Sequence, residues 1–363
     1  MPDFIPSLHI DLERTWRGGQ RQVYFLVREL RRDGHQAYLV SRKDSPLAKR
    51  LEDERLPVYT MRFFGEMDVM AARRIAKIAV KMGIRILHAH SSHAHTLALI
   101  AKRSVPGGRV IVHRRVDFKP GDDALNRWKY GSTDGYVAIS NAIKDVLVDY
   151  GIDQKKITVI HSAVEPATPS DDARRKIREE LGMDDETPLI LNVAALVDHK
   201  GHKFLVGAMP KVLQHFPKAV CIVAGEGELK GDISKQIKSL DLQENLKLLG
   251  FRQDVPDLMA AADLYISTSH LEGLNSSLLD ASMMGLPVVA TRAGGQPEAV
   301  SDGVSGLLAN NRDTEDIADK IIRILSNREL AAKLSRGGRE YARQFTPQAM
   351  ARQIAGFYER VAS

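Results

Sequence analysis

The sequence predicts an α/β protein made of two successive doubly wound domains, and three observations lead to this fold class. Short runs of β-branched residues alternate with amphipathic segments along the chain, a pattern typical of parallel strands joined by helices. The alternation stops once, over residues 163–185, and then starts again. The length of 363 residues is greater than that of one typical domain and suits two.

The first half of the chain contains seven candidate strands with helical segments between them. Gly19–Arg32 and Met67–Met82 carry apolar residues at helical spacing, and the first of these helices is expected to stop at Asp33-Gly34. The predicted strands are Leu8–Glu13, Gln36–Ser41, Val58–Arg62, Ile84–His90, Arg109–Arg115, Gly135–Ser140 and Ile157–His161.

A polar connector over residues 163–185, with a charged helix in its second part, separates the two halves. The alternation restarts after Thr187-Pro188, and each strand is again followed by a helical segment. The predicted strands of this half are Leu189–Val197, Ala219–Ala224, Leu246–Leu249, Leu264–Thr268, Pro287–Thr291 and Gly306–Leu308.

The last stretch of the chain, about forty residues, lacks a strand pattern and predicts two successive helices. Thr346 and Pro347 suit the N-cap and the first position of the second helix. We expect an N-terminal, acceptor-side domain over residues 1–165, a C-terminal donor-binding domain over 166–345, and a final helix, 346–363, that packs back toward the first domain. Because parallel sheets bind ligands at the carboxyl ends of their strands, two such domains would face each other across a shared cleft.

The composition excludes several classes of protein. With 44% hydrophobic and 27% charged residues the chain resembles an ordinary globular protein, and no apolar run approaches the roughly 20 residues that cross a bilayer. The segment Met1–Pro6 lacks the basic and apolar regions of a signal peptide. The single cysteine, Cys221, excludes an intrachain disulfide and lies in an apolar run that predicts a buried strand. We therefore expect a cytoplasmic protein.

Basic residues are concentrated in the first half of the chain. Residues 1–162 contain 28 Lys and Arg against 18 Asp and Glu, a net charge of +10, whereas the remainder has a net charge of −4. Arg73, Arg74, Lys77 and Lys81 are spaced so that they share one face of a predicted helix. This pattern favours reversible adsorption to an anionic membrane or an anionic glycan acceptor, although solvated helix faces explain it equally well. The apolar residues of the same helix are expected to pack in the core: Val69, Ile75, Ile78 and Val80.

The stretch Ser269–Gly285 combines carboxylates with turn-forming residues. A buried strand is expected to end there, Glu272-Gly273 forms a turn, and Asn275 or Ser276 is placed to cap the helix that follows. Glu272 at the mouth of the loop can accept hydrogen bonds from sugar hydroxyls. Asp280, more than one turn into the helix, either binds a ribose diol or is simply an exposed helix residue.

This stretch and its continuation, Gly285–Val300, resemble the Glu-(seven residues)-Glu region of the retaining glycosyltransferase family 4. The resemblance covers essentially the whole chain and implies the GT-B fold, in which two Rossmann-like domains face a cleft. It implies that Glu272 contacts the donor sugar and acts in catalysis, and that Asp280 holds the nucleotide ribose at a position where the family has glutamate. The loop residues that it implies for donor binding are Gly273, Leu274, Asn275 and Ser276.

The phosphate-binding segments of the family have counterparts here as well. Lys200 keeps the lysine of the family's Lys-Gly signature and can pair with a diphosphate as a point charge. The arginine of that signature is replaced by Ala195, so we expect His199, another basic residue or backbone N–H groups to supply the missing contact. Gly18 and Gly19 follow the first predicted strand and resemble the family's first βα loop, which lies against the donor phosphates and the acceptor.

Histidines follow two of the predicted strands. His88 and His90 share one face of a strand, which raises the question of a zinc site, but no cysteine or carboxylate accompanies them. The resemblance instead implies that one of the two lies at the cleft edge. A cleft histidine is implied at the next strand end, where His113, Arg114 and Arg115 all remain open. We take His90 and His113 as catalytic candidates and Arg115 as a phosphate candidate.

Three further expectations complete the predicted site. Arg115 could pair with Asp117 instead of a phosphate. Phe251 and Arg252 are candidates for contacts with the nucleotide base. No Asp-x-Asp or other metal motif is present in the sequence, so we expect neither a metal nor a cofactor.

The predicted reaction moves a sugar from a nucleoside diphosphate donor, UDP favoured over GDP, to a hydroxyl acceptor with the retention that the resemblance implies. The acceptor is expected to be a glycan or a lipid-linked saccharide in cell-surface glycan or lipopolysaccharide synthesis, with the enzyme peripheral at the inner face of the membrane. Two alternatives share the fold: a nonhydrolysing sugar-nucleotide epimerase and a catalytically weak GT-B subunit that binds a glycan. Nucleic acid is not an expected partner, because no basic run is interleaved with aromatic residues.

Overall fold

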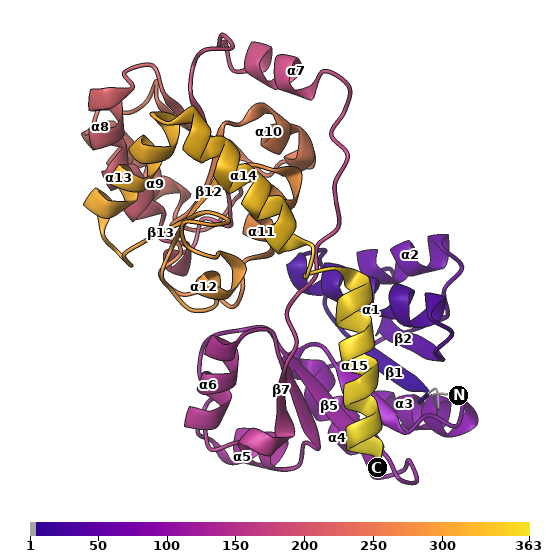
Figure 1. Ribbon diagram of the computed structural model, residues 1–363. Helices are drawn as coiled ribbons and strands as arrows, with labels where there is room; N and C mark the ends of the chain where they lie inside the picture. The colour runs from indigo at the N-terminus through magenta and orange to yellow at the C-terminus, as the bar shows by residue number, and fades with distance from the viewer. Residues whose placement is uncertain (1–4) are drawn as a thin grey trace. The chain divides into compact units, whose positions relative to one another are not determined.

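The computed structural model describes residues 5–363, so most of the segment Met1–Pro6, where no signal peptide is expected, lies outside the described residues. The chain divides into two compact units (Figure 1). Unit 1 consists of the described residues up to Ala163 together with Phe345–Ser363, and unit 2 of Val164–Gln344. Each unit contains one parallel sheet with helices between successive strands, so the predicted α/β fold class is confirmed.

The sheet of unit 1 has seven parallel strands in the order β3-β2-β1-β4-β5-β6-β7. The chain builds the sheet outward from β1 to β3, then returns to β4 on the other side of β1 and continues to β7. Each strand overlaps one of the predicted strands. Their bounds are β1 (Ser7–Asp11), β2 (Ala37–Arg42), β3 (Val58–Met61), β4 (Ile86–Ala89), β5 (Arg109–Arg114), β6 (Gly135–Ala138) and β7 (Ile157–Val159).

The helices of unit 1 start at side chains that cap them. Ser45, Asp68, Ser91, Asp123 and Ser140 each accept a hydrogen bond from the backbone N–H three residues further on, which satisfies a donor that the first turn leaves free. The bounds are α1 (Gly18–Arg32), α2 (Pro46–Asp53), α3 (Val69–Lys81), α4 (Ser92–Lys102), α5 (Ala124–Gly131), α6 (Asn141–Asp149), a 3-10 turn (Gln154–Lys156) and α15 (Pro347–Ala362).

Helix α3 corrects the prediction for its apolar face. Ile75 is fully buried, but Val69 and Val80 are 46% and 52% exposed and do not belong to the core. On a helix both lie roughly 120° or more around the axis from Ile75, outside the buried stripe. Small residues fill that stripe instead: Ala71, Ala72, Ala76 and Ala79.

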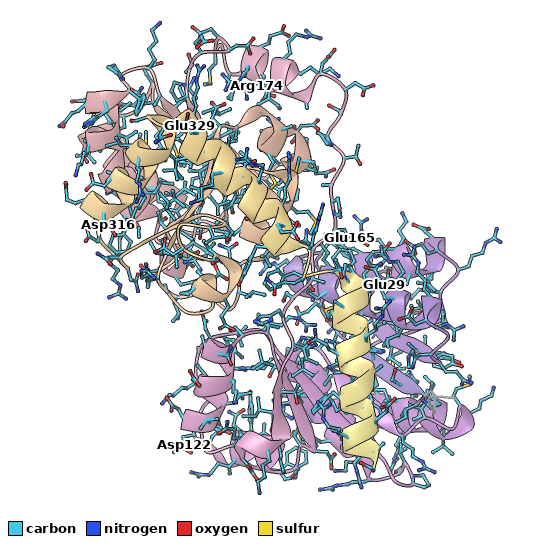
Figure 2. The ribbon with its side chains drawn as sticks, in the orientation of Figure 1. Glu29, Asp122, Glu165, Arg174, Asp316 and Glu329 are labelled. Carbon is cyan, nitrogen blue, oxygen red and sulfur yellow. The ribbon has the colours of Figure 1, made fainter. Side chains whose placement is uncertain are left out.

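Helix α15 completes unit 1 although it comes from the end of the sequence. It lies alongside α1 (Figure 1) and buries Ile354 and Phe357 in the same core as that helix. Gln348 donates from Nε2 to Glu29 Oε2 at 3.0 Å, and Figure 2 shows Glu29 beside the beginning of α15. Thr346 caps the helix and Pro347 occupies its first turn, as the sequence predicts.

The sheet of unit 2 has six parallel strands in the order β10-β9-β8-β11-β12-β13. The chain again builds in one direction, from β8 to β10, and returns to β11 on the other side of β8. Cys221 is fully buried in β9, where burial raises the pKa of its thiol to about 12. The bounds are β8 (Leu189–Val193), β9 (Val220–Ala224), β10 (Leu246–Gly250), β11 (Leu264–Ser267), β12 (Val288–Thr291) and β13 (Leu307–Ala309).

The first strand of unit 2 is shorter than predicted. The expected strand Leu189–Val197 ends at Val193 because the next residues turn to pack on another loop, with the Leu196 N–H donating to Glu226 O at 3.0 Å.

No helix of the described residues combines the length and apolar composition needed to cross a membrane. The helices of unit 2 are α7 (Ala173–Glu180), a 3-10 turn (Asp198–Lys200), α8 (His202–His215), α9 (Lys230–Ser239), α10 (Val255–Ala261), α11 (Ser276–Met284), α12 (Gln296–Ala299), α13 (Thr314–Leu325) and α14 (Arg328–Ala342).

We predict that Gly135→Ala destabilises unit 1. A methyl group on Gly135 of β6 would lie 2.7 Å from Cζ of Phe357 on α15, closer than carbon atoms pack. We expect a loss of about 1–3 kcal/mol in the free energy of unfolding. Urea denaturation followed by tryptophan fluorescence measures this loss for unit 1, because both tryptophans, Trp16 and Trp128, lie in that unit.

Gly131→Ala is the matched control for this variant. Gly131 ends α5 with open space around it, and alanine favours a helix over glycine, so we expect no loss. Equal losses in the two variants would contradict the packing argument.

Candidate active site

The strand order of each sheet reverses at one point, and predicted site residues lie at both points. At such a reversal the helices leave two neighbouring strands toward opposite faces of the sheet, which opens a crevice at the carboxyl ends of the strands. In unit 1 the reversal lies between β1 and β4, and in unit 2 between β8 and β11.

Four buried histidines lie on one face of the sheet of unit 1, beside the reversal. His9 is on β1, His88 on β4, His90 directly after β4, and His113 on β5. The strand register places His9 beside His88, and residues two positions apart on a strand share a face. The rings are in contact: the centroids of His88 and His90 are 4.2 Å apart, and those of His88 and His113 are 5.4 Å apart.

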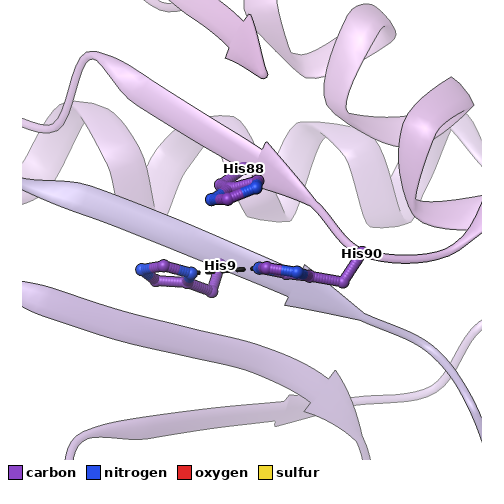
Figure 3. A group of neighbouring side chains, drawn as sticks. All are labelled: His9, His88 and His90. Atoms are coloured by element: carbon purple, nitrogen blue, oxygen red, sulfur yellow. Dashed lines mark hydrogen bonds between the residues drawn. The ribbon is translucent and has the colours of Figure 1, made fainter. Parts of the chain in front are cut away.

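A chain of hydrogen bonds joins two of these rings to Arg115, and Figure 3 shows its central link between His9 and His90. Arg115 Nη2 lies 3.3 Å from His90 Nδ1. His90 Nε2 lies 3.0 Å from His9 Nδ1, and His9 Nε2 lies 3.1 Å from Ser7 Oγ.

The chemistry of Arg115 sets the direction of this chain. A guanidinium has donors and no acceptor, so His90 accepts at Nδ1 and carries its proton on Nε2. His90 therefore donates to Nδ1 of His9. His9 in turn carries its proton on Nε2, which donates to Ser7 Oγ. One cation thus determines the tautomers of two rings.

Burial keeps the four imidazoles neutral. Burial, with a smaller contribution from the charge of Arg115, lowers the pKa of His9 to about 3. Burial also lowers the pKa values of His88, His90 and His113 well below the usual value, and Arg115 contributes in each case. The pKa of Arg115 itself is lowered by burial to about 10, so its guanidinium remains charged at neutral pH.

Three of the histidines are close enough to be considered as a metal site, because one nitrogen from each of His9, His88 and His90 lies within 4.8 Å of the others (Figure 3). His9 and His90 use both ring nitrogens in hydrogen bonds. Nδ1 of His88 lies 2.6 Å from the hydroxyl of Tyr358 on α15. The Arg115 cation next to His90 would also repel a metal ion. The hydrogen-bond pattern therefore favours a neutral polar network over a metal centre.

The glycine loop of unit 1 lies next to this network. Gly18 and Gly19 begin α1 just after β1, where the first N–H groups of the helix have no partner within the helix. A methyl group on Gly19 would lie 3.9 Å from Cδ of Arg115. The helix N-terminus and the guanidinium together make this end of the sheet attractive to an anion.

The three residues left open at the end of β5 have different partners. Arg114 donates from Nη1 to the Tyr130 hydroxyl at 3.0 Å, whereas His113 and Arg115 belong to the histidine network. Among the described residues Arg115 forms no ion pair with Asp117. The sequence-based alternative of an Arg115–Asp117 pair is therefore wrong.

In unit 2 the loops at the reversal bring Lys200 and Glu272 together. Lys200 ends the 3-10 turn after β8, and Glu272 lies in the loop after β11. Lys200 Nζ lies 2.5 Å from Glu272 Oε2. Their side chains are only 20% and 12% exposed, so the pair is largely shielded from water. Opposite charges in such a setting attract each other more strongly than at an open surface.

Several contacts hold Glu272 in place. Ser269 Oγ donates to Glu272 Oε2 at 3.1 Å, and the Gly295 N–H donates to Glu272 O at 2.9 Å. Gly294 has a φ of 52°, and a methyl group there would lie 2.0 Å from Glu272 O, so only glycine fits. Gln296 Nε2 donates to Ser269 O at 3.1 Å, which further fixes the loop that carries Glu272. The carboxylate is thus presented by a rigid support.

The residues after Glu272 build the start of α11. Asn275, and not Ser276, is the N-cap: its Oδ1 accepts from the Leu278 N–H at 3.2 Å. Its Nδ2 donates to Ser267 Oγ at 2.7 Å, so the side chain is fully used by the fold. Leu274 is buried, and Gly273 has no side chain beyond hydrogen. A donor could therefore meet this segment chiefly through its backbone and through Ser276.

Asp280 lies in the second turn of α11 and is half-buried, which argues against the interpretation of a plain exposed helix residue. Burial raises the pKa of the Tyr265 hydroxyl, and the charges of Glu272 and Asp280 add to this effect. Both carboxylates therefore lie near the same buried tyrosine at the reversal of the sheet.

The remaining candidates occupy less specific positions. His199 is exposed, and its carbonyl oxygen accepts from the His270 N–H at 2.9 Å. Phe251 is exposed directly after β10. Arg252 pairs with Asp254 at 2.6 Å and with Glu180 at 2.5 Å, and these hydrogen bonds raise its pKa. Arg252 therefore joins the segment after β10 to α7, which carries Glu180.

Four residues of these networks are missing from the sequence prediction: Ser7, His9, Ser269 and Tyr358. The sequence pattern could have identified His9, because the polar residues Ser7, His9 and Asp11 alternate with apolar residues along the strand and therefore share one face. Ser269 lies within the predicted motif but carries no signal of its own. Tyr358 is 270 positions from its partner His88, and no local pattern connects the two.

Two family models match the chain. The model described as Glycosyltransferase Family 4 matches residues 16–168, and the one described as Glycosyl transferases group 1 matches residues 173–341. N-acetyl-alpha-D-glucosaminyl L-malate synthase of Bacillus anthracis is 23% identical over 83% of this chain and 81% of its own. UDP-Gal:alpha-D-GlcNAc-diphosphoundecaprenol alpha-1,3-galactosyltransferase of Escherichia coli is 24% identical over 90% of this chain and 89% of its own.

Solved structures with the same architecture cover nearly the whole chain. Anabaena HepE (Alr3699) in complex with UDP and glucose superposes with a TM-score of 0.83 at 23% identity, over 98% of this chain and 99% of its own. A glycosyltransferase from Rickettsia africae superposes with a TM-score of 0.86 at 23% identity, over 99% of both chains. These likenesses concern the fold.

We predict that unit 1 loses stability as the pH falls from 6.5 toward about 5. The pKa of His9 is 6.5 in an ordinary setting and about 3 in the folded protein, so below pH 6.5 the unfolded chain binds a proton that the folded chain does not. The stabilisation is complete above pH 6.5 and is lost as the pH falls toward 3, by about 1.4 kcal/mol per pH unit for each such group. Urea denaturation followed by tryptophan fluorescence at several pH values measures the slope. His9→Asn should make it shallower, and an unchanged slope would show that His9 is not neutral in the fold.

Proposed function

The chain belongs to glycosyltransferase family 4 and has the GT-B fold, and we propose that it moves a sugar from a nucleoside diphosphate donor to a hydroxyl acceptor with retention of configuration. The observation that carries this proposal is the contact between Lys200 and Glu272 at the reversal of the unit 2 sheet. A diphosphate is bound by a cation, and sugar hydroxyls are bound by a hydrogen-bond acceptor such as a carboxylate. The two groups are adjacent here, as diphosphate and sugar are in the donor.

Lys200 and Glu272 would exchange partners when the donor binds. In the free protein each charge satisfies the other. In the complex the Lys200 ammonium would pair with the diphosphate, and Glu272 would accept hydrogen bonds from the sugar. As the bond between the anomeric carbon and the diphosphate oxygen breaks, Lys200 would stabilise the growing negative charge. The acceptor oxygen would bond to the same face and give its proton to the leaving phosphate, so no carboxylate nucleophile is required.

Unit 1 offers polar atoms that are buried and lack partners. Nδ1 of His113 and Nε and Nη1 of Arg115 have no hydrogen-bond partner among the described residues. Burying such groups unsatisfied is costly, and a phosphate or hydroxyl oxygen would remove the cost for the Arg115 donors. We assign Arg115 and the loop Gly18-Gly19 to phosphate, and His113 to the reacting hydroxyls. His90, whose two ring nitrogens are engaged by Arg115 and His9, would act by holding Arg115 in place.

The remaining assignments concern the nucleotide and the acceptor. Support for UDP over GDP comes from HepE, whose structure holds UDP, and Asp280 is our candidate for the ribose. The galactosyltransferase of Escherichia coli acts, by its name, on a diphosphoundecaprenol-linked sugar. We therefore propose a lipid-linked saccharide or a related cell-surface glycan as acceptor, used at the cytoplasmic side of a membrane, and reaction without a bound metal.

A ligand screen tests the proposal before the acceptor is known. Nucleoside diphosphates and their sugars are added in turn while thermal unfolding is followed, since a ligand at 100 times its Kd stabilises by about 2.7 kcal/mol. We expect UDP and a UDP-sugar to raise Tm. Release of UDP only when acceptor saccharides are added would separate an active transferase from a subunit that merely binds.

We predict that Glu272→Gln lowers transfer sharply and leaves the fold intact. The change keeps size and removes the charge that orients the sugar, at a cost of about 2–4 kcal/mol in the transition state, or a loss of about thirtyfold to several hundredfold in kcat. Steady-state kinetics at saturating donor measures it. Glu244→Gln, at an exposed position of unit 2, is the control. Turnover close to that of the control would exclude a role at the donor sugar.

We predict that Lys200→Ala weakens binding of UDP much more than binding of uridine, because the lysine is assigned to the diphosphate alone. The expected difference is about tenfold to a hundredfold in Kd. Calorimetry with both ligands measures it. Lys203→Ala is the control, since Lys203 lies three residues away, is exposed and pairs with Asp198. Equal losses for both ligands would place Lys200 elsewhere.

A further inference from the structure

Large apolar side chains face solvent in unit 1, in the loop of residues 62–68 between β3 and α3 and in the first turn of α3. Phe64 is 85% exposed, Met67 58% and Met70 59%, and Val69 adds to the same surface. Phe64 is the most exposed large apolar residue of those that the structure describes. Such a cluster exposed on a folded protein indicates a contact surface.

The two carboxylates of the loop, on Glu66 and Asp68, are engaged by bonds within unit 1. Glu66 accepts from Thr96 Oγ1 at 2.5 Å and pairs with the buried ammonium of Lys129. Asp68 accepts from the Phe64 N–H at 3.0 Å and also caps α3. These bonds hold the loop in which Phe64 and Met67 are exposed.

The outer face of α3 continues this surface with positive charge. Arg73, Arg74, Lys77 and Lys81 are all exposed, and α3 itself contains no acidic residue. None of the four forms an ion pair with a carboxylate of the described residues. The row therefore keeps its full charge, and it begins one turn beyond Met70.

A groove beside this row brings two of the cations to the edge of the sheet. It has a volume of about 480 Å³ and lies between α3 and β3, the edge strand of unit 1. Arg74 and Lys77 line it from the helix, and the backbone and side chains of Tyr59 and Thr60 line it from the strand. Two cations and a hydroxyl around a hollow of this size suit a phosphate group.

We propose that this surface, the basic-apolar face (Phe64, Met67, Met70, Arg74 and Lys77), docks unit 1 on an anionic phospholipid membrane. Phe64 and Met67 enter the boundary between headgroups and acyl chains, and Arg74 and Lys77 bind lipid phosphates in the groove. Unlike adsorption through charge alone, this attachment has an apolar part that salt does not screen. It goes beyond the proposed reaction and does not depend on it.

Charge complementarity identifies the occupant. A lipid leaflet offers an apolar layer directly beneath a plane of phosphates, and the basic-apolar face presents apolar and basic groups side by side in the same way. A second copy of the chain would bring two rows of like charge together, which is unfavourable.

The test is co-sedimentation of the full chain with phosphatidylcholine vesicles that contain or lack phosphatidylglycerol, at low and high salt. We expect binding that requires phosphatidylglycerol and is weakened, but not abolished, by salt. The double variant Phe64→Ser, Met67→Ser should lower the partition coefficient about tenfold and remove the part that resists salt. The variant Arg74→Glu, Lys77→Glu should lower it by about a hundredfold at low salt.

Matched controls lie in unit 2. Leu240→Ser with Val304→Ser removes two exposed apolar side chains, and Lys333→Glu with Arg336→Glu reverses two exposed charges three positions apart on α14. Both controls should bind vesicles like the parent chain, and thermal unfolding confirms that all variants are folded. Absent binding, equal binding to neutral vesicles, or equal losses in the controls would overturn the proposal. A concentration-dependent dimer that Phe64→Ser, Met67→Ser abolishes would overturn it in favour of self-association. Vesicle binding needs no donor, so failure of the proposed reaction leaves this test unaffected.

Discussion

The right-handed crossover between parallel strands is the constraint on which the rest of this molecule depends. Because each crossover has one hand, a chain that builds a sheet in both directions must place its helices on opposite faces on the two sides of the starting strand. Each sheet here therefore has one uncovered point, between β1 and β4 and between β8 and β11. The histidine network lies at the first of these points and the Lys200–Glu272 pair at the second. Residues far apart in sequence meet there because the strands that precede them are neighbours at the reversal of each sheet.

Matched hydrogen bonding allows so many polar groups to lie at the core of unit 1. Arg115 only donates hydrogen bonds. His90 and His9 each accept one hydrogen bond and donate one, and Ser7 accepts the last. Reversing any tautomer would place two protons or two lone pairs against each other. Within this network the unmatched atoms lie on His88, His113 and Arg115, and those of His113 and Arg115 are the ones that we assign to substrate.

The sequence predicts the strands and the caps well because their causes are local. Alternating β-branched runs, and Thr346 before Pro347, act over a few residues. It also places Lys200 and Glu272 in loops that follow two of the predicted strands, but it does not show that these strands are neighbours or that the two side chains are in contact. Contacts such as His88 with Tyr358, or Arg252 with Glu180, depend on elements that meet only in the folded chain. The outward position of Val69 and Val80 was missed for another reason: the prediction followed apolar side chains, whereas the buried stripe of α3 consists mainly of alanines around Ile75.

The return of α15 to unit 1 has a consequence for synthesis on the ribosome. Unit 2 is one continuous segment, Val164–Gln344, and can fold as soon as it has emerged. Unit 1 is made first, but Phe357 and Tyr358, which close its core, are translated after the whole of unit 2, and with them the Tyr358 hydroxyl that bonds to His88. The first unit to be translated is therefore the last to be completed. Until then the apolar residues of α1 that pack against α15 lack that partner, although the second unit can already fold.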